Sequence, residues 1–222
     1  MSRIDAFSDV VFGFALTLLV VSLEVPKDFS DLHEAVRGFI PFAICFTMLL
    51  TLWYAHYVFF RRYGLHDQLT ILLNCFLLFV VLFYVYPLKF LFSTLVCQMS
   101  HSDSTPYFTA PGQVTELMVL YALGFAAVYF LLAALYWNAW RHRESLALNG
   151  LERLLTVSSI IDAFGLAAIG LIACLASLIL PSEWSGHSGY IYFLIAPWKT
   201  LSGMYFGHKA RTLRKLVAAP NL

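Results

Sequence analysis

Three side chains that can form hydrogen bonds occur at a common depth inside otherwise apolar segments. Counted from the charged residues that end their segments, Asp9, His56 and Asn74 all lie roughly 8 to 10 Å deep at 1.5 Å per residue. A carboxylate at such a depth is costly and needs a partner, which imidazole and amide groups can supply. We therefore expect these three residues to form a hydrogen-bonded network. The residues expected to complete it are Ser8, Trp53 and Arg3. The network either only holds helices together or takes part directly in gating or proton sensing.

A pair of opposite charges occurs deeper in the apolar sequence. Asp162 and Lys199 each lie ten residues from a charged segment end, which places both roughly 15 Å deep, near the midplane of a bilayer. Equal depth on neighbouring antiparallel helices predicts an ion pair. This pair is either a structural clamp or a proton- or ion-coupling site in a transporter.

The composition requires that these residues be positioned by membrane-spanning helices. The chain is 60% hydrophobic and 12% charged, with a mean hydropathy of +0.76, whereas soluble domains carry roughly 25% charged residues. We predict an all-α integral membrane protein, with residues 1–222 forming a single domain of six transmembrane helices. The expected spans are 3–26, 38–60, 68–88, 117–140, 154–180 and 189–208.

The distribution of Lys and Arg predicts the orientation of these helices. If six helices alternate in direction, ten basic residues fall on one side and only Lys27 and Arg37 on the other. The ten are Arg3, Arg61, Arg62, Arg141, Arg143, Arg153, Lys209, Arg211, Arg214 and Lys215. Because positive charge is enriched in cytoplasmic loops, we place both termini in the cytoplasm.

The chain carries few signals for catalysis or metal binding. The seven histidines show no ligand spacing, and no HxxxH, CxxC or glycine-rich phosphate-binding pattern is present. Three of the four cysteines lie in apolar segments, where packing is their usual role. We expect no enzyme activity, no structural metal, no cofactor and no nucleic-acid partner.

The start of the chain resembles a known family. Arg3, Phe7, Ser8 and Asp9 spell R-x-x-x-F-S-D, which resembles the signature of the TMEM175 potassium-channel family. The resemblance continues through F-A-L-T-L-L-V-V-S-L-E-V-P over residues 14–26. It also includes Trp53 and His56 in the second span, and Asn74 and Pro87 in the third.

This resemblance implies a potassium-conducting cation channel that lacks the TVGYG selectivity filter. Single-repeat members, mostly prokaryotic, are homotetramers in which four copies of the first helix line the pore. By position, the resemblance places the constriction at Phe14, Leu18 and Val21, with Thr17, Val25 and Glu24 flanking it. It also implies a plasma-membrane location, with potassium and other monovalent cations as permeant ions. Phe14 departs from the Ile or Leu expected there and would narrow the path further.

Helical periodicity independently places Phe14, Leu18, Val21 and Val25 on one stripe of the first helix, with Thr17 at its edge. Such a stripe either packs in a protomer core or lines a pore, where rings of apolar side chains gate by dewetting. Glu24 would then contribute to an acidic outer mouth that concentrates cations, or only to a solvated rim. The rival function is a secondary transporter or proton pathway that uses Asp162 and Lys199, or Asp9 and His56.

Overall fold

The computed structural model describes residues 3–21, 28–99, 108, 110, 112–181 and 184–218, which fold into six α-helices and one 3-10 helix, with no strand in these ranges. The elements are α1 (Arg3–Val21), α2 (Phe29–Tyr63), α3 (Gln68–Met99), α4 (Gln113–Arg141), α5 (Gly150–Ile179), η1 (Ser185–Leu194) and α6 (Ile195–Ala218).

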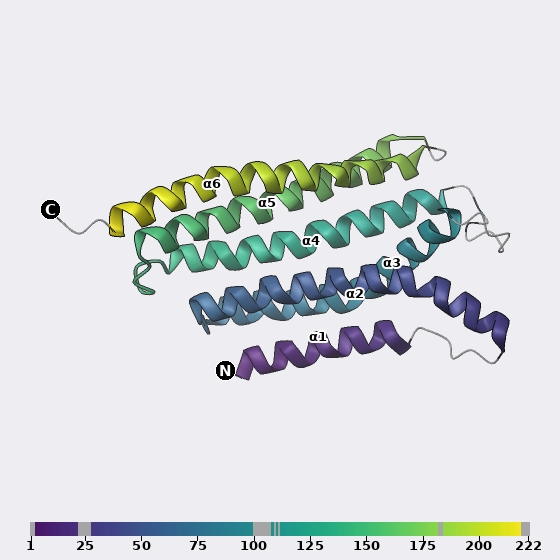
Figure 1. The fold of residues 1–222 in the computed structure, drawn as a ribbon, viewed down its shortest axis with the longest axis horizontal. Helices are drawn as coiled ribbons and strands as arrows, with labels where there is room; N and C mark the ends of the chain where they lie inside the picture. The colour runs from purple at the N-terminus through teal and green to yellow at the C-terminus, as the bar shows by residue number, and fades with distance from the viewer. Residues whose placement is uncertain are drawn as a thin grey trace.

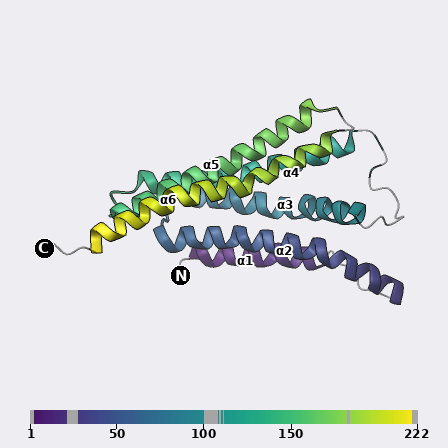
Figure 2. The same ribbon diagram turned by 45° about the horizontal axis from the view of Figure 1, so that its top comes forward.

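The helices form one elongated bundle with α1 and α6 on opposite sides (Figure 1). α1 packs on α2 and α3, α3 packs on α4, and α5 lies between α4 and α6. After rotation, α1 and α2 again lie on one side of α3, and α4, α5 and α6 lie on the other (Figure 2). The start of α1 and the end of α6 lie at the same end of the bundle (Figure 1), as an even number of crossings requires.

The prediction of six apolar spans holds for five of the six helices. α1, α2, α3, α4 and α5 are each long and apolar enough to cross a membrane. α6 by itself is not among them, because its second half is rich in basic and polar residues. The segment predicted as the sixth span, 189–208, starts in η1 and continues into α6.

Two helices extend well beyond their predicted spans. α2 has 35 residues, which corresponds to about 52 Å, and it begins at Phe29 instead of residue 38. α3 continues through Pro87 to Met99, so the turns after the proline extend the helix. Both helices are longer than the roughly 30 Å of a bilayer's hydrocarbon layer.

Glycines allow close contacts between neighbouring helices on the α4–α6 side. The ring of Tyr84 on α3 lies against Gly124 on α4, and the ring of Trp198 on α6 lies against Gly165 on α5. A Cβ atom at Gly165 would lie only 2.1 Å from Cε2 of Trp198, so only glycine fits there without a rearrangement. Trp198 therefore helps to fix where α6 docks on α5.

We expect Gly165→Ala to destabilise the folded protein by about 1–3 kcal/mol, the usual cost of overpacking. Gly203→Ala on α6 is the matched control, because a Cβ at Gly203 meets no atom within 4 Å. Thermal unfolding in detergent measures both variants. Equal melting temperatures for the two would contradict a tight Trp198–Gly165 contact.

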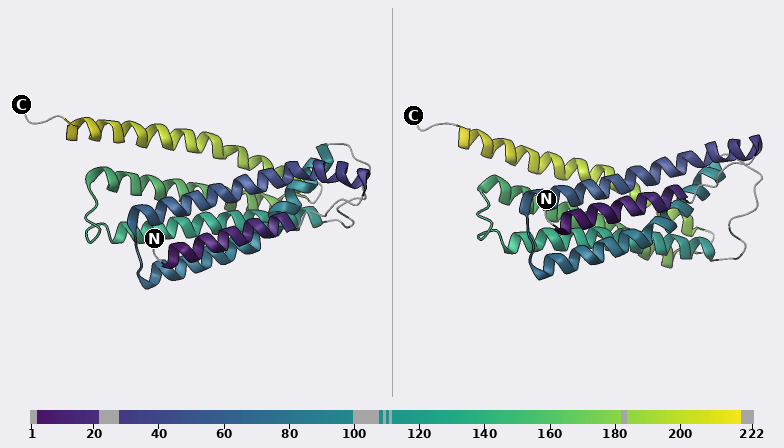
Figure 3. Two further views of the ribbon diagram at one scale, coloured as in Figure 1. Left: turned by 60° about the horizontal axis from the view of Figure 1, so that its bottom comes forward. Right: turned by 90° about the horizontal axis from the view of Figure 1, so that it is seen from below.

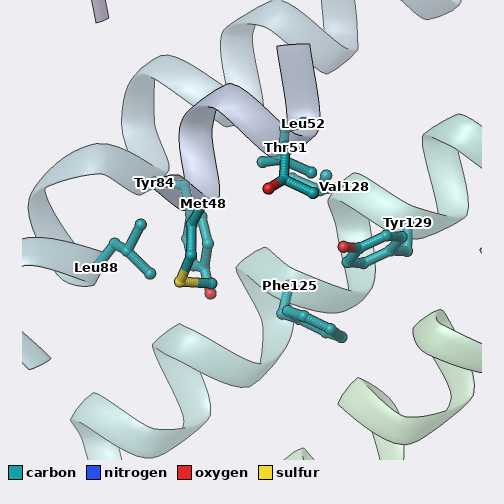
Figure 4. Close-up of a pocket in the computed structure, with 8 residues that line it drawn as sticks. All are labelled: Met48, Thr51, Leu52, Tyr84, Leu88, Phe125, Val128 and Tyr129. Atoms are coloured by element: carbon teal, nitrogen blue, oxygen red, sulfur yellow. The ribbon is translucent and has the colours of Figure 1, made fainter. Parts of the chain in front are cut away.

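A cavity of about 100 Å³ separates parts of α2, α3 and α4. Figure 4 shows the residues that line it: Met48, Thr51, Leu52, Tyr84, Leu88, Phe125, Val128 and Tyr129. Most of its lining residues are apolar, and the Tyr84 hydroxyl donates to the backbone oxygen of Tyr121 over 3.1 Å. α2 is therefore held mainly by α1 and α3, and these three helices pack together as one half of the bundle.

Candidate functional site

One side of α1 packs against the bundle and the other is exposed. Ser8, Phe12, Ala15 and Leu19 are buried, and their spacing of three or four residues places them on one face of the helix. Phe12 packs on the ring of His56, with the ring centroids 5.6 Å apart. The first helix is thus fixed to α2 and α3 through a face different from the predicted pore stripe.

A buried hydrogen-bonded chain joins α1, α2 and α3. His56 Nε2 lies 2.7 Å from Asn74 Oδ1, and Asn74 Nδ2 donates to Ser8 Oγ over 2.9 Å. Ser8 in turn donates to the backbone oxygen of Ile4 over 2.8 Å. Since Ser8 and Asn74 are 0% exposed and His56 is 2% exposed, these bonds form in an apolar environment where each is costly to break.

Asp9 is bound separately from this chain. Trp53 Nε1 donates to Asp9 Oδ1 over 2.8 Å, so the carboxylate is paired with indole and not with the imidazole of His56. The expected participation of Arg3 is not observed: Arg3 is exposed, and among the residues that the structure describes it makes no ion pair with Asp9. Phe7 is also exposed, at 56%. The R-x-x-x-F-S-D motif therefore supplies two separate contacts, through Ser8 and through Asp9.

An open pocket of about 300 Å³ lies beside these two contacts. Its lining residues are Asp5, Asp9, His56, Tyr57, Phe60 and Arg61. Within the described part of the chain, no group of three or more His, Cys, Asp or Glu residues is arranged to hold a metal ion. The pocket lies at the end of the bundle where α1 begins and α2 ends.

The residues predicted to form the constriction lie on the outer side of α1. Phe14 is 55% exposed, Val21 is 73% exposed and Leu18 is half-buried. Thr17 is exposed, and its hydroxyl donates to the backbone oxygen of Gly13 over 2.9 Å. The stripe therefore does not belong to the protomer core. Glu24 and Val25 lie outside the described residues.

Asp162 and Lys199 meet where α5 packs on α6. Lys199 Nζ lies 3.4 Å from Asp162 Oδ2, and the two side chains are 49% and 26% exposed respectively. The left view of Figure 3 shows α6 and α1 on opposite sides of the bundle, and α1 makes no contact with α5 or α6 in the described part of the chain. The two pairs of ionisable residues singled out in the sequence are therefore far from each other in the fold.

Sequence reasoning missed a third polar cluster, which joins α3 to α4. Asn138 Nδ2 donates to both carboxylate oxygens of Asp67, over 3.2 and 3.1 Å, and to Thr70 Oγ1 over 3.0 Å. Thr70 also donates to Asp67 through its hydroxyl and its backbone N–H. The available signal was an asparagine within an apolar helix and an Asp-x-x-Thr at a helix start, a pattern typical of N-terminal capping.

The hydrogen bonds of this cluster determine how Asp67 titrates. Burial alone would raise the pKa of the carboxyl, but bonds from Thr70 and Asn138 outweigh it and hold the pKa below its ordinary value of 3.8. A carboxyl with a lowered pKa stabilises the fold above its unfolded-state pKa, and the contribution is lost as the pH falls through the folded-state pKa.

We expect Asn138→Ala to destabilise the protein by about 1–3 kcal/mol near neutral pH, because the Asp67 carboxylate and the buried Thr70 hydroxyl lose their amide donor. The variant should also lose less stability than the unchanged protein when the pH falls from about 6 to about 3. Without the Asn138 bond, the pKa of Asp67 in the folded state is lowered less, so its protonation changes the stability less. Thermal unfolding at the two pH values measures both effects. A parallel pH dependence in the two proteins would contradict this role of Asn138.

These features define the class of protein: a helical, polytopic membrane protein whose first helix is fixed by a buried polar network and exposes an apolar stripe. Comparison with known proteins specifies the class further. A family profile described as "Endosomal/lysosomal potassium channel TMEM175" matches residues 3–84. A potassium channel of Marivirga tractuosa is 40% identical over 96% of this chain and 90% of the relative. The chain belongs to the TMEM175 family of potassium channels.

Solved structures agree with this membership. A crystal structure of a variant of the potassium channel MtTMEM175, in complex with a nanobody–MBP fusion, matches with a TM-score of 0.82 and 38% identity over 94% of both chains. A TMEM175 homologue from Chamaesiphon minutus matches with a TM-score of 0.59 and 24% identity, over 90% of this chain and 96% of that chain, and supports the fold alone.

Proposed function

We propose that this protein is a homotetrameric channel that conducts potassium passively across a prokaryotic plasma membrane, with both termini in the cytoplasm. Four copies of α1 surround the pore, and Phe14, Leu18 and Val21 form its constriction. The observation that carries the proposal is the division of α1 into two faces. Its buried face is fixed by Ser8 and Phe12, so its apolar stripe is presented at the protomer surface, where symmetry mates can meet.

The chemistry of the stripe determines how such a pore works. The sequence contains no TVGYG motif, so an ion at the constriction is not offered a ring of backbone carbonyls. Apolar rings raise the cost of partial dehydration and keep a narrow pore dry until it widens. Thr17 carries the hydroxyl group of α1 that is closest in sequence to Phe14. The hydroxyl proton is already donated to the backbone oxygen of Gly13. Thr17 offers a passing cation its oxygen lone pairs.

Flux into liposomes tests the proposal against the rival transporter. We expect purified protein in potassium-loaded liposomes to give a passive cation flux that rises with the ion gradient without saturating. Asp162→Asn should leave this flux unchanged, because the Asp162–Lys199 pair lies on α5 and α6, away from α1. Saturating, pH-coupled uptake that Asp162→Asn abolishes would establish the transporter instead.

Images of the purified particle test the arrangement of subunits. Four-fold symmetry with α1 nearest the axis is the expected result. A particle in which α1 faces lipid, or in which another helix surrounds the axis, would reject the proposed pore.

A further inference from the structure

We infer that neighbouring subunits are joined by packing the exposed aromatic face of α3 in one subunit into a groove on α2 of the next. This inference rests on the proposed ring of four copies around α1, and names the surfaces that close the ring. The "aromatic face" comprises Leu72, Phe76, Phe79, Phe83, Tyr86 and Phe90. The "α2 groove" is lined by Phe39, Ile40, Ala43, Ile44, Thr47 and Met48.

The spacing and type of residues on the aromatic face are those of a helix-packing surface. From Leu72 to Phe90 its members are separated alternately by four and three residues, which is the a/d pattern of helices that pack by knobs into holes. Between 42% and 68% of each side chain is exposed in the protomer. Five of the six carry aromatic rings, the residue class most enriched at the centres of protein interfaces.

The exposed face of α5 provides a contrast within the same molecule. Its exposed large residues near the C-terminal end are all aliphatic: Leu171, Ile172, Leu175, Leu178 and Ile179. Acyl chains solvate such a surface adequately, and its position beside α6 is far from α1 (Figure 1). We therefore assign the aliphatic face of α5 to lipid, and the aromatic face of α3 to protein.

The α2 groove has the shape to receive these rings. It is an open groove of about 490 Å³, and its lining includes the small side chains of Ala43 and Thr47. Small residues at such positions let a neighbouring helix approach closely inside a membrane. The Thr47 hydroxyl donates to the backbone oxygen of Ala43 over 2.8 Å, so covering the groove would leave no donor unpaired.

The groove and the aromatic face also lie at the same depth. Thr47 is 16 residues before the end of α2 at Tyr63, and Phe83 is 15 residues after the start of α3 at Gln68. Because residues 64–67 form a short connection, these two positions are nearly level. A rotation axis normal to the membrane preserves depth, so Phe83 and Tyr86 of one subunit meet the level of Thr47 and Ala43 in the next.

The two surfaces also lie on the sides of α2 and α3 that point away from the buried residues of each helix. On α2, Leu49 and His56 are buried on the side opposite the groove, and on α3, Val81 and Val85 are buried on the side opposite the aromatic face. α1 packs along one edge of this pair of helices, and α4 packs along α3 at the other (Figure 2). Two different, complementary surfaces are what a closed head-to-tail ring requires.

Cysteine cross-linking tests this interface directly. In a background with the four native cysteines replaced by alanine, a chain that carries both Thr47→Cys and Phe83→Cys is treated with a short bifunctional maleimide in membranes. A head-to-tail interface predicts a ladder of two, three and four linked chains on a denaturing gel. Either substitution alone should give no ladder. A control pair on the lipid side, Thr47→Cys with Leu175→Cys, should give none either.

A second variant measures the interface without a cross-linker. Thr47→Trp fills the α2 groove and should lower the tetramer fraction in detergent about tenfold, whereas Leu175→Trp on the lipid side should not change it. Unchanged helical circular dichroism shows that both variants are folded.

The outcomes separate this inference from the proposed function. A four-fold particle without the ladder, or with Thr47→Trp still tetrameric, overturns the α2–α3 interface and leaves the proposed pore standing. Linked dimers from Phe83→Cys alone also overturn it, because they require two aromatic faces to meet. A particle that is not four-fold rejects the proposed function and this interface together.

Discussion

Replacing Phe14 with alanine is expected to raise the passive potassium flux of the reconstituted protein by about tenfold or more. A reduction of about 1.4 kcal/mol in the barrier to permeation is enough for this change. The side chain is 55% exposed on the outer face of α1, so its removal opens no cavity in the protomer core. Four missing rings would widen the constriction and lower the cost of hydrating it.

Phe130→Ala is the control for this experiment. Phe130 lies on α4, is 56% exposed and loses the same atoms, but it belongs to the half of the bundle away from α1. The potassium flux of the Phe130→Ala variant should match that of the unchanged protein. Phe14→Trp should change the flux in the opposite direction, because a larger ring narrows the path. If all three variants conduct equally, Phe14 does not form the constriction.

The tetrameric assembly can be predicted from the sequence only through the family resemblance, for a physical reason. The heptad pattern of the aromatic face is present in the sequence, but an apolar run in a membrane helix is expected whether it faces lipid, the protomer core or another subunit. Only the fold shows which of these faces is left uncovered. The exposure of Phe79 and Phe83 therefore carries information that their residue types do not.

Depth counting, in contrast, predicted contacts well where polar residues are rare. His56 and Asn74 are joined as their common depth suggests, and Lys199 lies beside Asp162. Ser8 completes the first chain, whereas Asp9, at the same depth, bonds to Trp53 instead. A buried polar group in an apolar layer has few possible partners, so a common depth nearly specifies the contact. The same counting could not decide that Asp9 pairs with Trp53, since the rotation of each helix about its axis is set by packing.

The polar cluster around Asn138 was missed because it lies at the end of the bundle. Near a helix end, water is an alternative partner for Asp67, and the sequence gives no reason to prefer an asparagine from α4. The limits of the sixth span were harder to predict for a related reason. Its apolar residues are shared between η1 and α6, and hydropathy does not reveal where a 3-10 helix gives way to an α-helix.

The second large effect is expected from Asn74→Ala, which should destabilise the protein by roughly 3 kcal/mol. Asn74 links His56 to Ser8, and all three residues are buried. Without the Asn74 amide, Nε2 of the buried His56 ring loses its hydrogen-bond partner, which lowers the free energy of unfolding by about 1–3 kcal/mol. The cavity left by the missing side chain lowers it further. Cys75→Ala is a suitable control because Cys75 is the next residue in α3 and is exposed.

A double-mutant cycle with Ser8→Ala shows whether the network acts as a unit. If Asn74 stabilises α1 through Ser8, the double variant should be less destabilised than the sum of the single variants, by about 0.5–3 kcal/mol. The liposome flux should fall in parallel, because α1 loses the bond that sets its rotation and thus the direction of Phe14. If the losses of stability are additive, Asn74→Ala destabilises the protein only through its lost bond to His56. If the flux is unchanged, the network does not control the pore.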